Sequence, residues 1–185
     1  MTAFTIEVKS DAVQAVLKKL ASRAGGLRPV LDNIGTKILE RTERRFDTSI
    51  GPDGVKWEKN SDVTLALLAG RIAGKKSKVK KDGSLNAAGQ RAYANKKPLI
   101  GESGKLGGLR GQFKTVATET SLTVSNTMAY AAIQQFGGIL GPTTWFPGKK
   151  IPARPFLPVH QDGTLYPAEQ TEVLAALNHF LMEGL

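Results

Sequence analysis

The stretch that decides the fold is PVLDNIGTKILERTERRFDTSIGPDGVKW, residues 29–57. Leu31, Ile34 and Ile38 fall on one face at helical spacing, which predicts an amphipathic helix whose apolar side packs on a sheet. The tetrapeptide GPDG then combines two glycines, a proline and an aspartate, which favours a tight turn. Behind this turn Trp57 either folds back on the core or lies on a partner surface.

The residues before this helix predict one strand and one further helix. Phe4, Ile6 and Val8 alternate with polar residues, as in a strand with one buried face. Ser10 is suited to cap a helix. Its apolar stripe is formed by Val13, Val16, Leu17 and Leu20, and Gly25 and Gly26 are the expected stop signals.

The residues after it predict a hairpin and two helices. Strands are expected at 113–118 and 122–125, with Val116, Leu122 and Val124 on one face. Residues 129–136 suit two helical turns ended by Gly137 and Gly138. The last helix begins at Pro167 and has an apolar face formed by Val173, Leu174, Leu177, Phe180 and Leu181.

Three prolines, Pro152, Pro155 and Pro158, recur at the period of a polyproline-type strand. A stiff, solvated segment of this kind lies on another protein at little entropic cost. We therefore expect residues 139–158 to form an extended interaction arm.

These elements predict an α+β fold with a single domain over residues 1–185, a length that suits one core. A small antiparallel sheet is packed by two N-terminal helices and one C-terminal helix. A long basic loop and the proline-rich arm complete the chain. We detect no internal repeat.

The net charge of +10 is concentrated in one part of the chain. Residues 71–114 hold twelve Lys or Arg against two acidic residues, and the rest of the chain is balanced. Such a segment either faces a negatively charged partner or is a solvated loop. Because residues 71–97 contain few large apolar side chains, we expect a flexible insertion or an arm that orders on binding.

Catalytic and metal-binding patterns are not found in the sequence. The chain has no cysteine, so thiolate chemistry and disulfides are excluded. His160 and His179, the two histidines, lack metal-ligand spacing, and Gly70 and Gly74 miss the spacing of a phosphate-binding loop. We therefore expect no enzyme, cofactor or metal, and neither a signal peptide nor a membrane span.

Three motifs carry a resemblance: GPDGVKW at 51–57, YAAIQQFGG at 130–138 and IPARPFL at 151–157. Each places a turn or extended segment beside aromatic residues, which suits a contact surface. Together with PLIGESGKLGGLRGQF at 98–113, they resemble the phage virion morphogenesis family, the tail completion proteins of Mu-like and P2-like phages. The chain has Gln134 where many relatives have histidine and Ser103 where we expect threonine, and residues 71–97 lack an evident counterpart.

The resemblance implies a structural virion protein at the neck of a tailed phage, made in the host cytoplasm. It would complete the tail or join it to the head, as a homo-oligomeric ring of six or twelve copies. Its implied partners are the head connector and the tail tube or terminator proteins, with non-specific contact to packaged DNA and no membrane. The alternative class is a free-standing DNA-binding protein that ignores sequence.

Two sets of residues are expected to make these contacts. In the arm, Phe156 would anchor on a neighbour and Arg154 would bind its carboxylate. The expected subunit interface is formed by Trp57, Tyr130, Gln135, Phe136, Gly137, Arg154, Pro155 and Phe156. The residues expected to face DNA or an acidic partner are Lys75, Lys76, Lys78, Lys80, Lys81, Arg91, Lys96 and Lys97.

Overall fold

The computed structural model describes residues 4–5, 10–21, 26–101, 108–144 and 146–183. Its helices are α1 (Asp11–Ala21), α2 (Arg28–Thr48), α3 (Asp62–Ala73), α4 (Ala87–Ala94), α5 (Ala131–Phe136) and α6 (Pro167–Glu183). Its strands are β1 (Phe4–Thr5), β2 (Phe113–Ala117), β3 (Leu122–Asn126), β4 (Gly138–Ile139) and β5 (Lys150–Ile151). The fold class is α+β, as predicted.

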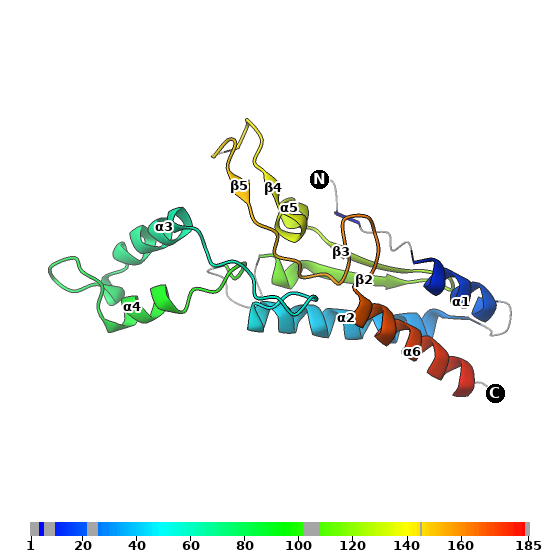
Figure 1. Ribbon diagram of the computed structural model, residues 1–185. Coiled ribbons are helices and arrows are strands. Elements are labelled where there is room, and N and C mark those ends of the chain that lie inside the picture. The colour runs from blue at the N-terminus through cyan, green and yellow to red at the C-terminus, as the bar shows by residue number, and fades with distance from the viewer. Residues whose placement is uncertain (1–3, 6–9, 22–25, 102–107, 145, 184–185) are drawn as a thin grey trace.

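The body of the molecule is an antiparallel sheet in the order β1-β3-β2, packed on the long helix α2 (Figure 1). Helix α6 packs on α2, and α1 packs on α6, so the two helices close this end of the core. Helix and sheet come close at Gly35, where a Cβ would lie 2.9 Å from Leu122 Cδ1. The predicted bounds of α2 and α5, and the predicted starts of α1 and α6, agree with the structure to within two residues. Helix α1 ends at Ala21, ahead of the stop signals that we expected at Gly25 and Gly26. The strand residues Ile6 and Val8 and the stop signal Gly25 lie outside the described residues. The stripe residues Val16, Leu17 and Leu20 lie within α1, but their side chains are not described.

The β2–β3 hairpin is confirmed, but one side chain faces the other way. Val116 is opposite Thr123 and is 60% exposed, while Ala117 is opposite Leu122 and is buried. The four residues 118–121 form the turn, with Thr118 N–H donating to Ser121 O. Since successive strand residues alternate between faces, Leu122 and Val124 share the core face with Ala117, not with Val116.

This assignment of faces predicts the effect of one substitution. Val116→Thr should change the free energy of unfolding by less than about 0.5 kcal/mol, because the side chain is exposed. Val124→Thr, which places a hydroxyl against the core, should cost about 1–3 kcal/mol. Urea denaturation of both variants checks this, and the reverse order of effects would contradict the register.

Residues 71–97, where we expected a flexible insertion or an arm that orders on binding, contain helical structure in place of a loop, and their flexibility stays a prediction. Together with residues 61–70 they form a helical lobe, defined here as residues 61–97, that contains α3, a short 3-10 turn and α4. Ser61 Oγ accepts the Thr64 N–H, and Asn86 Oδ1 accepts two N–H groups at the start of α4. These caps, with alanine-rich helical sequences, compensate for the shortage of large apolar residues.

A tight turn recurs three times, at residues 50–56, 79–85 and 159–165, although we detected no repeat in the sequence. In each turn the first and last residues form an antiparallel bridge, and an aspartate oxygen accepts the N–H two residues on at 2.9 Å. Hydrogen bonds donated by Ser84 and Thr164 lower the pKa of Asp82 and Asp162. The glycine that follows each aspartate has φ between 77° and 87°, which explains the repeated Asp-Gly pair.

Candidate interaction arms and their junction

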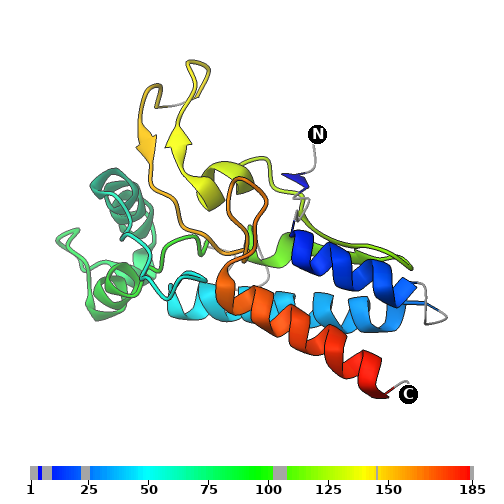
Figure 2. The ribbon, with the colours of Figure 1, turned by 45° about the vertical axis from the view of Figure 1, so that its right-hand side comes forward.

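Two arms project from the body in different directions (Figures 1 and 2). One is the helical lobe, and the other is the β4–β5 hairpin, residues 138–151. We did not foresee this hairpin, because its paired strands are only two residues long and show no alternating pattern. The hairpin begins and ends at one part of the body, and the lobe begins there too. We call this part the junction and define it as residues 51–59, 134–138 and 151–159.

Gln135 holds the junction together. Its side chain is 1% exposed, and its Oε1 accepts the N–H groups of Phe156 and Leu157, both at 2.9 Å. Its Nε2 donates to the carbonyl oxygens of Leu157 at 3.0 Å and Val159 at 3.1 Å. The amide therefore satisfies four buried backbone groups of the segment from residue 156 to residue 159.

Gly137 allows the two sides of the hairpin to meet. Its φ is 73°, a region that favours glycine. A Cβ at this position would lie 2.9 Å from Ala153 N and 3.0 Å from Ile151 O. We expected the Gly137-Gly138 pair only to end α5. Gly137 also leaves space for the backbone of residues 151–153.

An aromatic cluster joins the first and third motifs. Trp57 Nε1 donates to Pro155 O at 3.0 Å, and its ring meets Phe46 edge-on with centroids 5.5 Å apart. Phe156 packs on both Phe46 and Phe113, and it is 0% exposed. All three motifs therefore converge inside one subunit.

The structure corrects the expected role of the proline-rich arm. Phe156 is part of its own subunit's core, so it is not a free anchor for a neighbour. Arg154 donates to Glu58 O and Lys59 O within its own subunit, both at 2.9 Å, and its contact with a neighbour's carboxylate stays a prediction. The segment from 152 to 158 packs on the body because Gln135 and Trp57 bind its backbone, and only the preceding hairpin projects.

The other expected interface residues also lie at or beside the junction. Trp57, Gln135, Arg154 and Phe156 are buried, and Phe136, Gly137 and Pro155 are partly buried. Tyr130 is 43% exposed, and partial burial raises the pKa of its hydroxyl. The exposed apolar side chains of the hairpin were missed: Ile139 is 71% exposed and Phe146 43%. Trp145 lies outside the described residues.

The basic residues separate into two groups. Lys75, Lys76, Lys80, Lys81 and Arg91 are exposed on the lobe, and Lys78 is partly exposed. Lys96 and Lys97 instead donate to backbone carbonyls of Ile100 and Asp47 at the base of the lobe. Asn60 Nδ2 also donates to Lys96 O at 3.1 Å, so the two ends of the lobe are joined.

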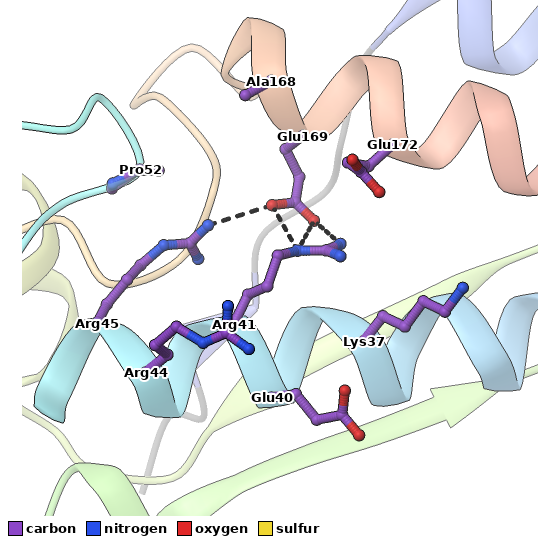
Figure 3. A pocket seen from close by; sticks show the side chains of 9 residues that line it. All are labelled: Lys37, Glu40, Arg41, Arg44, Arg45, Pro52, Ala168, Glu169 and Glu172. Atoms are coloured by element: carbon purple, nitrogen blue, oxygen red, sulfur yellow. Dashed lines mark hydrogen bonds and ion pairs between the residues drawn. The ribbon is translucent and has the colours of Figure 1, made fainter. Parts of the chain in front are cut away.

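A separate ion-pair cluster fixes α6 to α2 (Figure 3). Glu169 is 3% exposed and accepts hydrogen bonds from Arg41 and Arg45. Burial lowers the pKa of the Arg45 guanidinium, and Glu169 acts in the opposite direction. The hollow beside this cluster has a volume of about 490 Å³ and is lined by charged side chains of both signs. We infer that the ion-pair cluster stabilises the fold.

No group of three or more potential metal-ligating side chains occurs in the parts of the chain that the structure describes. None of the helices within those ranges is both long and apolar enough to span a membrane.

A body that holds two exposed arms is typical of a protein that works through contacts with other macromolecules. The chain belongs to the phage virion morphogenesis family, which it matches over residues 8–104. Its general role is therefore in the structure or assembly of a phage virion. The matched range includes residues 71–97, which we had expected to lack a counterpart, and it ends before the motifs at 130–138 and 151–157. No curated protein and no solved structure matches the chain.

Proposed function

We propose that this protein is a structural, non-enzymatic subunit that completes the tail, or joins it to the head, at the neck of a tailed phage. In this proposal, six or twelve copies form a ring around the DNA channel, and the ring contacts the head connector and the tail tube or terminator. Membership of the virion morphogenesis family supports the general role. The finer role rests on the two arms, which give each subunit separate surfaces for different neighbours.

The single observation that carries the proposal is the helical lobe. It holds nine basic and two acidic residues, a net charge of +7, on a projection whose two ends meet. In the ring, these lysines would face DNA phosphates without reading sequence, which suits a conduit for a whole genome. Alternatively, the same lysines would bind an acidic ring of a neighbouring neck protein.

The charge of the lobe can be tested without disturbing the fold. Lys75, Lys76, Lys80 and Lys81 are exposed, so replacing all four with glutamine should leave the free energy of unfolding within about 0.5 kcal/mol of the original. Because four charges are lost from one surface, complementation of a phage lacking the gene should fall by about 100-fold or more. Electron microscopy should then show separate heads and tails.

The matched control replaces four exposed lysines of the body, Lys18, Lys37, Lys56 and Lys114, with glutamine. It makes the same change in net charge and should complement normally. Equal loss in both variants would mean that total charge matters and that the lobe has no special role.

The second candidate function is a free-standing DNA-binding protein, which the same lysines favour. It predicts monomers or dimers that bind DNA more weakly as salt increases. The logarithm of the binding constant should fall against the logarithm of the salt concentration with a slope of about 0.9 per phosphate neutralised. Sedimentation at low and moderate salt, with and without DNA, separates the two. Tight binding by a small species in the absence of rings would favour this candidate.

A further inference from the structure

A cleft of about 450 Å³ lies where the lobe, the body and the hairpin meet. The chain that enters the lobe contributes residues 58–61, and the chain that leaves the lobe contributes residues 99–101. The hairpin contributes residues 149–151, Pro152 follows directly, and the body adds Tyr130. The cleft thus joins segments far apart in the sequence, and both arms border it.

The lining is cationic but its walls are partly apolar. Lys59, Lys96, Lys149, Lys150 and Arg154 line it, with Glu58 as the acidic residue. Lys96 is engaged by the backbone, donating to Lys97 O at 3.3 Å and to Ile100 O. The apolar part of the wall is formed by Leu99, Ile100, Leu109, Ile151 and Pro152.

Arg154 is the unusual member of this lining, because it is a buried cation bonded only to neutral groups. It is 7% exposed, and its acceptors are Glu58 O, Lys59 O and, at 3.5 Å, Gln134 Oε1. No carboxylate of the described residues forms an ion pair with it. A guanidinium carries five N–H groups, so two remain beyond these three contacts.

The two other buried or nearly buried arginines show the usual arrangement. Arg110 Nη1 lies 2.6 Å from Asp47 Oδ1, and this hydrogen bond raises the pKa of Arg110. Arg45 Nη2 lies 3.1 Å from Glu169 Oε2. For Arg154, burial lowers the pKa, and the nearby charge of Glu58 opposes this without a direct ion pair. Buried charges in proteins are normally paired with an opposite charge, and among the described residues Arg154 has no carboxylate in an ion pair with it.

We propose that this cleft binds a carboxylate side chain from an acidic segment of a partner protein, with Arg154 as its main donor. The proposal rests on the proposed function, since the partner is a neighbour in the assembly. A glutamate or aspartate on an extended peptide reaches into a recess between apolar walls and meets two spare N–H groups, a geometry that guanidinium matches well. Duplex DNA presents its phosphates on a broad convex surface, which the exposed lobe fits better than a recess does.

The experiment is a titration followed through the Arg154 side chain. An acetylated oligoglutamate peptide is added to ¹⁵N-labelled full-length protein at about 0.15 M salt, where exposed charges are largely screened. We expect the Arg154 Nε–H resonance to move in a saturable manner. In Lys59→Gln/Lys150→Gln, which removes two charges from the rim of the cleft, affinity should fall by about tenfold.

The matched control is Lys80→Gln/Lys81→Gln, which removes two charges from the lobe and should change the affinity by less than about twofold. Arg154 itself is kept, because its hydrogen bonds support the junction. A static Arg154 resonance, equal weakening in both variants, or the same resonance shift with a short DNA duplex would each overturn the proposal. None of these outcomes affects the complementation and sedimentation tests of the neck role, so the two proposals fail separately.

Discussion

Replacing Gln135 with leucine is expected to cost about 3–5 kcal/mol of the free energy of unfolding, from four hydrogen bonds of about 1 kcal/mol each plus the penalty for buried groups left unpaired. The four groups that lose their partner are the N–H groups of Phe156 and Leu157 and the carbonyls of Leu157 and Val159. Leucine has a similar size, so the effect reports lost hydrogen bonds more than a cavity. Urea denaturation followed by tryptophan fluorescence measures it.

The neighbouring residue provides the control. Gln134 is partly buried, and its side chain makes one long contact, 3.5 Å, with Arg154. Gln134→Leu should therefore cost less than about 1 kcal/mol. If Gln135→Leu were as mild as Gln134→Leu, the amide would not be holding the 156–159 segment. A partly stable Gln135 variant should also lose activity in complementation, because the junction orients both arms.

Replacing Glu169 with alanine should have an effect of similar size, about 3–5 kcal/mol. The carboxylate is the shared partner of Arg41 and Arg45, so its removal leaves Arg45 nearly buried and without its counter-charge (Figure 3). The same change loosens α6 from α2, since the contact spans these two helices. Thermal and urea denaturation of the variant measure the loss.

Two further variants isolate the cause. Glu172→Ala, at an exposed residue one turn further along the same helix, should stay within about 0.5 kcal/mol of the original protein. A triple variant with methionine at 41, 45 and 169 should recover much of the stability, because an apolar set of similar volume avoids the unpaired charges. Recovery stays incomplete, as Arg45 Nη1 also donates to Phe156 O at 3.0 Å. A triple variant less stable than Glu169→Ala would contradict this explanation.

The elements that sequence analysis found are those with strong local signals. The helix over 28–48 has a regular apolar face and ends at the turn at Gly51, and the last helix starts at Pro167. Both signals act within a few residues of the chain, so no knowledge of packing was needed. The lobe had local signals too, in Ser61 and Asn86 as helix caps, but its lysine content favoured a loop.

The errors concern properties that depend on distant residues. The face of Val116 depends on the pairing register with β3, which the apolar pattern of one strand does not determine. The strands β4 and β5 of the hairpin contain two residues each, and at its base Gly137 approaches the backbone of residues 151–153 closely. Such an element has no periodicity to detect.

The amino-acid sequence by itself determined the family, the fold class, most helix bounds and the three motifs that matter. Only the tertiary structure decided what those motifs do: they bind one another inside the subunit and leave the lobe and the hairpin exposed. The reason is that a side chain such as Gln135 or Phe156 is equally able to bind its own chain or a neighbour. Which one it binds depends on the segments that folding brings within hydrogen-bond or van der Waals distance.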